Sequence, residues 1–222
     1  MRNAFFRGAL CCSAALALTG CDLALALANT DSRFVTEEFK RDAARAKAAF
    51  QASTPTPSLP TMGNGIYVGF GRIDIAEALY GPEGTQLIGQ ANLNAAFSSS
   101  GATLDGTVNN FFYRNDTVFA GLREALESED PDQVGAALEG FESASGELTV
   151  TANSISSPLF EADVAGSIDT GSRSFLFGGA TAGQFFGDDA EVVRLTGNTV
   201  GALTVTDGST AQNADLIIIG TQ

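Results

Sequence analysis

Acidic residues and tyrosines are the residues that could do chemistry in this chain of 222 residues, because the commonest catalytic side chains are missing. There is no histidine, and the three cysteines all lie within the first 21 residues. The rest of the chain therefore has no imidazole base, no thiol nucleophile and no thiolate metal ligand. It also has no phosphate-binding glycine loop followed by a helix. We therefore expect that the protein is not an enzyme.

Neighbouring acids occur at Asp188-Asp189 and at Asp130 with Asp132. Acids in turns and at helix starts usually bond to the local backbone and stay solvated, so we expect no catalytic carboxylate pair. Asp188, Asp189 and Glu191 would offer oxygen ligands to calcium, but calcium takes six to eight. We predict no metal site and no cofactor.

The formal net charge of −14 describes an acidic protein. It falls to −16 when the leader is removed, because the leader holds Arg2 and Arg7 and no acid. Binding to nucleic acid phosphates needs clustered lysine and arginine, so we expect no nucleic acid partner. The charge would attract cationic partners, although a solvated acidic surface explains it without any partner.

Residues 1–20 have the pattern of a secretory signal peptide. Two arginines are followed by a short apolar run, Gly8–Gly20, which is too short to be a spanning helix. The next residue, Cys21, ends the sequence Leu18-Thr19-Gly20-Cys21, which resembles the bacterial lipobox. That resemblance implies a lipoprotein in which Cys21 carries the acyl chains, palmitate included.

Several acyl chains on Cys21 would give stable anchoring to a membrane. We therefore expect a lipid-anchored protein of the bacterial outer membrane, on its periplasmic face or its surface face. The alternative is ordinary signal cleavage after Ala28 with no lipid. Asp22 argues against it, because this charge would then lie inside the apolar run.

Residues 21–60 are predicted to form a lipidated tether. Apolar residues recur at three- and four-residue spacings from Thr30 to Phe50, which predicts a helix. With interleaved basic and acidic residues, this helix is either a solvated tether or docked on the membrane surface or on the following domain. Residues 52–60 are rich in proline, serine and threonine, which predicts an extended and fairly stiff linker. We place the domain boundary at Thr61.

Residues 61–222 consist mainly of short alternating segments separated by turn residues, without a βαβ pattern. We predict an all-β fold, an antiparallel eight-stranded up-and-down barrel, because closure removes the sheet edges. A β-sandwich is the alternative. The outward faces carry asparagine, acids and threonine without aromatic girdles, so we do not expect a transmembrane barrel. The predicted strands cover residues 65–73, 87–97, 102–108, 148–152, 159–168, 173–186, 191–205 with a break at Gly197, and 214–220.

Residues 115–142 interrupt the alternation and predict a short insert of two helices. Asn115 or Asp116 would cap the first helix, and Asp130 followed by Pro131 is a strong start for the second. Both helices have an apolar side that must dock somewhere. The insert is either a plug over an open barrel end or an acidic lid or partner-binding element.

The stretch Gly183–Glu191 reads G-Q-F-F-G-D-D-A-E, which predicts a tight corner between two strands. It resembles the motif G-x-F-Y-G-P-x-A-x-E-x-G-G, which ends the barrel domains of transferrin-binding protein B and related bacterial lipoproteins. The departures are Phe186 for the usual tyrosine, Asp188 for the usual proline, and Val193-Arg194 near the usual paired glycines. Any glycine-rich β-corner is the alternative interpretation. The residues matched to the motif are Gly183, Phe185, Phe186, Gly187, Ala190 and Glu191.

The resemblance covers roughly residues 65–222 and implies a monomeric surface lipoprotein that binds a solute or a host or envelope protein, in some members during iron or haem acquisition. Haem would need an axial tyrosine or methionine, since histidine is absent. Tyr113, beside the helical insert, is the first candidate and Tyr67 the second, before Tyr80 and Met62. Each is otherwise a residue of the core or rim. The alternative function is a structural or interaction lipoprotein whose barrel is filled by side chains.

Overall fold

The computed structural model describes residues 37–76 and 81–222, so the predicted signal peptide, Cys21 and Tyr80 lie outside the described residues. Glu38–Gln222 forms one compact unit, which includes residues assigned above to the tether. Its main strands are β1 (Gly63–Ala76), β2 (Glu83–Ser98), β3 (Gly101–Val118), β5 (Ser145–Ile155), β6 (Leu159–Asp169), β7 (Ser174–Phe186), β8 (Val192–Asn198) and β11 (Asn213–Thr221).

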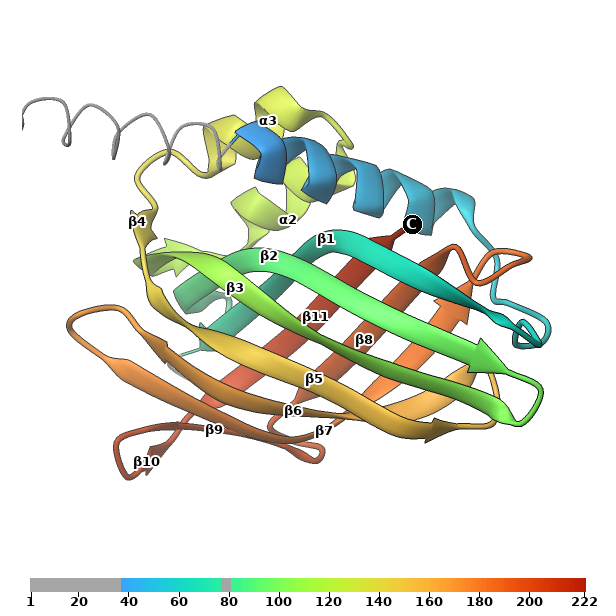
Figure 1. Cartoon of the computed structure of the whole chain (residues 1–222). Coiled ribbons are helices and arrows are strands. Elements are labelled where there is room, and N and C mark those ends of the chain that lie inside the picture. Colours follow the sequence, from blue (N-terminus) through green and yellow to red (C-terminus); the bar gives the residue numbers. More distant parts are fainter. Residues whose placement is uncertain (1–36, 77–80) are drawn as a thin grey trace, which may run out of the picture. The chain divides into compact units, whose positions relative to one another are not determined.

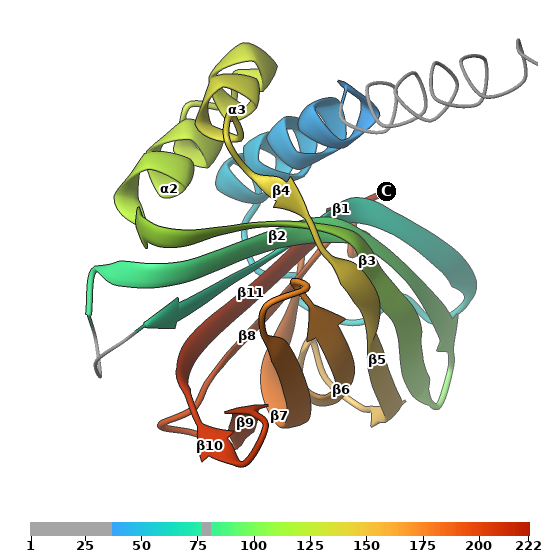
Figure 2. The ribbon, with the colours of Figure 1, turned by 90° about the vertical axis from the view of Figure 1, so that its left-hand side faces the viewer.

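These eight strands form a closed antiparallel barrel in the order β1-β2-β3-β5-β6-β7-β8-β11, with β11 paired to β1 and β8 paired to β7. Figure 1 shows the strands crossing the barrel obliquely, and Figure 2 shows the curved wall from the side. The predicted eight-stranded barrel is confirmed. The small strands β4 (Glu142–Ser143), β9 (Leu203–Asp207) and β10 (Thr210–Ala211) extend the wall.

Strand β7 has two successive partners on one side. Its second half, Ala182–Phe186, pairs with β8, and its first half, Phe175–Gly179, pairs with β9. The predicted strand over residues 191–205 is therefore divided, with residues 199–202 leaving the wall between β8 and β9. This division leaves the outer wall uneven where β8 and β9 meet β7.

Alternation places one face of each strand in the barrel interior. Tyr67 and Ile73 of β1 belong to the interior cluster, whereas Phe70 belongs to a second cluster on the outer wall. The face of β1 that carries Ile66, Val68 and Phe70 is thus the outer one. Ile219 of β11 also lies in the outer cluster and Ile218 in the interior cluster, so the apolar closing strand is buried on both sides.

In the described part of the chain, three helices lie over this outer cluster: one over residues 37–52, α2 (Ala120–Glu127) and α3 (Pro131–Ala137). Both views show them together on one side of the barrel, above β1, β2 and β3 (Figures 1 and 2). No helix in the described residues is both long and apolar enough to cross a membrane. Buried side chains from the helices and from the wall form this cluster. The helices contribute Phe39, Ala43, Ala46, Leu122, Leu126, Val134 and Leu138, and the wall contributes Phe70, Ile88, Phe186, Val192 and Ile219.

The structure corrects two expectations about the insert. Its helices cover the outer wall and do not plug a barrel end, because the apolar residues that receive them point outward. The first helix starts later than predicted, since β3 continues to Val118 and α2 begins after Phe119, which makes no side-chain cap. The predicted start of the second helix is confirmed, because the Asp130 carboxylate accepts a hydrogen bond from the Asp132 backbone N–H at 2.9 Å.

The segment after the first helix runs along the barrel end. Pro55 bridges to Phe186, the Thr56 N–H donates to the Phe185 carbonyl at 3.0 Å, and the Gly187 N–H donates to the Thr54 carbonyl at 2.8 Å. Residues 54–56 of the proline-rich linker are therefore held against the predicted corner.

Candidate functional site

The predicted corner closes one end of the barrel, and its first residues build an aromatic cluster there. Phe185 is fully buried, with its ring centroid 5.0 Å from that of Phe160 and 5.5 Å from that of Phe97. Gly183 makes room for this packing, because a Cβ atom at this position would lie 2.3 Å from the Phe160 ring. The glycine and aromatic positions of the motif therefore have a packing role.

The second half of the corner binds Tyr67. The Tyr67 hydroxyl donates to the Ala190 carbonyl at 2.6 Å and accepts from Gln222 Nε2 at 3.2 Å. Ala190 is buried and has a positive φ of 58°, in the left-handed region. Burial raises the pKa of Tyr67 to about 12. Tyr67 thus locks the corner to β1 and already has partners for its oxygen.

The other tyrosine proposed above as a ligand lies on β3 and faces a different partner. The Tyr113 hydroxyl donates to the Glu142 carboxylate at 2.8 Å, and this hydrogen bond raises the pKa of Tyr113. Met62 lies before β1 with 79% of its surface exposed. The structure therefore does not bring Tyr67, Tyr113 and Met62 together around a common cavity.

A polar cluster lies at the end of the barrel where β7 begins. Arg173 Nε donates to the Asp207 carboxylate at 2.7 Å, Nη1 to the Thr85 hydroxyl at 3.2 Å and Nη2 to the Gln212 side chain at 3.2 Å. The guanidinium also lies 4.6 Å from the centroid of the Phe175 ring. Because these partners come from β2, β9 and the loop before β11, Arg173 ties three parts of this end together.

Side chains fill the space between the two ends. Inward-facing residues of all eight strands form one cluster of buried apolar residues, and many of them have no exposed surface. Eight-stranded barrels are just wide enough for side chains to fill them or for one small ligand. The packing of buried side chains such as Leu87, Val150, Val164, Phe175 and Leu195 into one cluster favours the filled kind.

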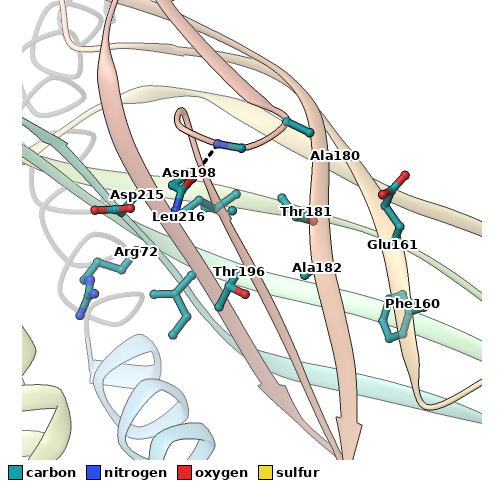
Figure 3. Close-up of a pocket in the computed structure, with 14 residues that line it drawn as sticks. Arg72, Phe160, Glu161, Ala180, Thr181, Ala182, Thr196, Asn198, Asp215 and Leu216 are labelled. Atoms are coloured by element: carbon teal, nitrogen blue, oxygen red, sulfur yellow. Dashed lines mark hydrogen bonds between the residues drawn. The ribbon is translucent and has the colours of Figure 1, made fainter. Parts of the chain in front are cut away.

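The outer wall carries a groove where β7 parts from β8. Its volume is about 520 Å³, and small residues of β7 and β8 make its floor. Arg72 and Asp215 lie on one side of it, and Phe160 and Glu161 lie on the opposite side (Figure 3). The Gly201 N–H donates to Asn198 Oδ1 at 2.8 Å and shapes the loop at its rim. The floor and rim residues are Ala180, Thr181, Ala182, Thr196, Gly197, Asn198, Gly201 and Ala202.

The charges of the groove are mostly negative. Glu161 and Asp215 are exposed, and within the described residues no hydrogen bond or ion pair engages either carboxylate. The Arg72 guanidinium lies 3.3 Å from the buried carboxylate of Asp74. Burial lowers the pKa of Arg72, although an arginine stays protonated at neutral pH. Arg72 is therefore paired with Asp74, and it also attracts the Asp215 carboxylate.

Metal binding has no geometric support within residues 37–76 and 81–222, where no three acidic, cysteine or histidine side chains are grouped to hold an ion. Of the acids suggested above as calcium ligands, Glu191 serves the turn itself. The Glu191 carboxylate accepts a hydrogen bond from the Asp189 backbone N–H at 3.1 Å. Asp188 lies in the same turn, and Asp189 is exposed.

Comparison of the chain with protein-family models, with curated proteins and with solved structures gives no match. The resemblance to the transferrin-binding protein B family therefore stays a prediction that rests on the residues quoted above.

Sequence reasoning did not identify the groove, because its lining comes from five strands and depends on their register. A weak signal was present. Outward positions 180 and 182 are alanines, Gly197 is the predicted break in the strand, and Gly201 follows it. Small outward residues on adjacent strands indicate a hollow only once their pairing is known.

Proposed function

We propose that this chain is a lipid-anchored interaction protein of the bacterial cell envelope, which binds a partner protein through the outer groove of a filled barrel. The observation that carries this proposal is the packed interior, because inward side chains occupy the space where a small ligand would lie. A solute held inside the barrel is therefore the less favoured form of the binding function. Haem binding is disfavoured for the same reason, and because Tyr67 and Tyr113 already donate their hydroxyl protons.

The groove supports the proposal because it is an outward-facing hollow lined by residues of five strands. Its volume of about 520 Å³ lies within the range of binding pockets in proteins. It faces outward, so that a macromolecule can reach it without any opening of the barrel. The lipid at Cys21 would hold this surface near the membrane: fifteen residues separate Cys21 from residue 37, and even fully extended they span only about 50 Å.

Photo-crosslinking in the native envelope tests the proposal. A photoreactive residue is placed at Ala182 in the groove floor or, as the matched control, at Thr151 on the outer wall of β5, which is also exposed. We expect a discrete crosslinked partner band from position 182 and none from position 151. Equal crosslinking from both positions, or none from either, would favour the alternative of a structural lipoprotein with a filled barrel.

The lipid anchor is tested separately. Labelling with palmitate and membrane fractionation are carried out on the native chain and on Cys21→Ala. We expect the native chain to be labelled and to stay with the outer membrane fraction, and we expect the variant to lose the label. A variant that is labelled like the native chain would show that Cys21 is not the lipidated residue.

A further inference from the structure

We infer that the outer groove binds an extended, lysine- or arginine-rich segment of its partner. This inference rests on the proposed function and adds the chemistry of the bound segment. It is carried by the register of the strands that form the groove and by the balance of charges along it.

The strand register gives the groove its direction. Glu161 pairs with Ala182, Ala182 with Thr196, and Thr196 with Ile217, which in turn pairs with Arg72. These residues form one row across β6, β7, β8, β11 and β1, so the row covers four strand spacings. Strands lie about 4.8 Å apart, so the row is about 19 Å long. An extended segment of about six residues, at about 3.3 Å for each residue, has this length.

The floor of the row admits a polypeptide backbone. Thr196 is its central residue, with Ala182 on one side and Ile217 on the other, and Gly197 next to Thr196 has no side chain. Glu161 stands at the β6 end of the row and Arg72 at the β1 end (Figure 3). Ile217, next to Arg72, packs partly against the outer cluster that the helices cover. A segment lying across the floor would therefore reach both end walls with its side chains.

The charges at the two ends favour a cationic segment. The Glu161 carboxylate has no cationic partner among the described residues, and it stands at the β6 end of the row. Asp215 lines the groove near the β1 end. Arg72 at that end is bound to Asp74, which also binds Arg123 at 2.6 Å. Lysine or arginine side chains near both ends of the segment would meet a carboxylate at each end.

The surroundings extend the negative field beyond the groove. A second hollow, lined by Arg123, Glu124 and Glu127, shares Asp215 with the groove. Among the described residues around the two hollows, two arginines face five carboxylates, so the net charge of this region is negative. A field of one sign steers oppositely charged partners and makes their binding sensitive to salt. The carboxylates are Asp74, Glu124, Glu127, Glu161 and Asp215.

A protein segment fits the groove better than a free small cation does. Pockets for small molecules enclose most of the ligand, whereas this groove runs along the outer wall and leaves one side of any occupant exposed to solvent. An extended segment needs only one of its sides covered, because its alternate side chains point away from the floor.

Binding of a labelled hexalysine peptide to the full mature chain, held in non-ionic detergent, tests the inference by fluorescence anisotropy. The groove variant Glu161→Gln/Asp215→Asn is compared with Asp105→Asn/Glu147→Gln. The control removes the same charge from exposed residues of β3 and β5 outside the groove. We expect the groove variant to raise the Kd about tenfold, as the loss of two partly exposed ion pairs predicts, and the control to raise it less than about twofold.

Three outcomes would overturn the inference. Equal weakening by both double variants would mean that the peptide responds to the overall charge of the protein and not to the groove. Absence of saturable binding by the native chain would exclude a basic segment as the occupant. Binding of spermidine without binding of hexalysine would identify a small polyamine ligand instead.

A steric variant gives an independent readout. Ala182→Arg places bulk and positive charge on the floor, at an exposed position where the fold tolerates a larger side chain. We expect it to weaken hexalysine binding at least as strongly as the double groove variant, with an unchanged unfolding transition. A crosslink at position 182 to a partner without a basic segment, together with no hexalysine binding, would leave the proposed function in place and reject this inference alone.

Discussion

The Arg123 guanidinium lies 2.6 Å from the buried carboxylate of Asp74, and this ion pair joins helix α2 to the barrel wall. Arg123 Nε also donates to the same oxygen at 3.1 Å. From the wall itself, Gln86 Nε2 donates to Asp74 at 2.7 Å, and Arg72 Nε lies 3.3 Å away. Asp74 therefore has partners on both sides, which offsets the free energy lost when its charge is buried.

Replacement of Asp74 tests whether this carboxylate holds the helical layer. In Asp74→Ala, the largely buried Arg72 loses its nearest counter-charge and Gln86 loses an acceptor. We expect the free energy of unfolding to fall by about 3 kcal/mol, the range for breaking a buried pair from one side. Urea unfolding measures it. The exposed acid Asp105 offers a control, since Asp105→Ala should change stability by less than about 0.5 kcal/mol. Equal effects of the two substitutions would contradict the assigned role.

The raised pKa of Tyr67 predicts that the folded protein loses stability at high pH. Its folded pKa is raised to about 12, whereas an unfolded tyrosine titrates near 10. Between these values the folded chain keeps a proton that the unfolded chain has lost, so stability is fully present below pH 10 and decreases as the pH rises towards 12. The measurement is a series of urea unfolding curves across this range. Tyr67→Phe should show a smaller decrease over the same window, and an unchanged decrease would assign it to other groups.

The strand pattern was predictable because alternation is a local property of the sequence. Each predicted strand lies within or close to an observed one, and residues expected to face inward, such as Leu93, Leu104 and Val164, belong to the interior cluster. Asp130 followed by Pro131 likewise identified a helix start from adjacent residues alone. The matched corner residues Phe185 and Ala190 proved to have roles in packing and in accepting the Tyr67 hydrogen bond.

The position of the helices was not predictable in the same way. Amphipathic spacing shows that a helix has an apolar side, but not which surface receives it. The sequence does contain the complementary signal, because Phe70, Ile88 and Ile219 are apolar although they alternate with inward residues. Recognising them as one patch requires the pairing of β1 with β2 and β11. The groove was missed for the same reason, since its ends, Glu161 and Arg72, are brought together only by the register.

We predict that Gly187 allows the corner to contribute measurably to the stability of the fold. Its φ is +85°, and a Cβ atom would overlap the Glu191 carboxylate that accepts the Asp189 N–H. Gly171 is a matched control, with φ of +81° and no atom within 4 Å of the place that a Cβ would take. We expect Gly171→Ala to lower the free energy of unfolding by about 1 kcal/mol, for the left-handed backbone alone. Gly187→Ala should lower it by about 2 kcal/mol, because the hydrogen bond is also lost.

Thermal or urea unfolding of the two glycine variants measures this difference. The double variant Gly187→Ala/Glu191→Ala removes the overlap and should be no less stable than Gly187→Ala. If Gly187→Ala and Gly171→Ala were equally stable, the Glu191 carboxylate would have no part in the corner.

We predict that the stability of the barrel end near β9 and β10 depends on the side chain of Arg173. Its guanidinium donates to Asp207, Thr85 and Gln212 and lies over the Phe175 ring. Arg173→Ala should lower the free energy of unfolding by about 2 kcal/mol, as for other hydrogen bonds to a charged group. It should also accelerate amide hydrogen exchange in β9, β10 and the start of β11, while the corner at the opposite end keeps its protection. Arg173→Lys keeps the positive charge but cannot make the three hydrogen bonds of the planar guanidinium. We therefore expect an exchange rate between those of the native chain and Arg173→Ala. Uniform acceleration over the whole barrel would show that Arg173 stabilises the fold globally and does not close this end.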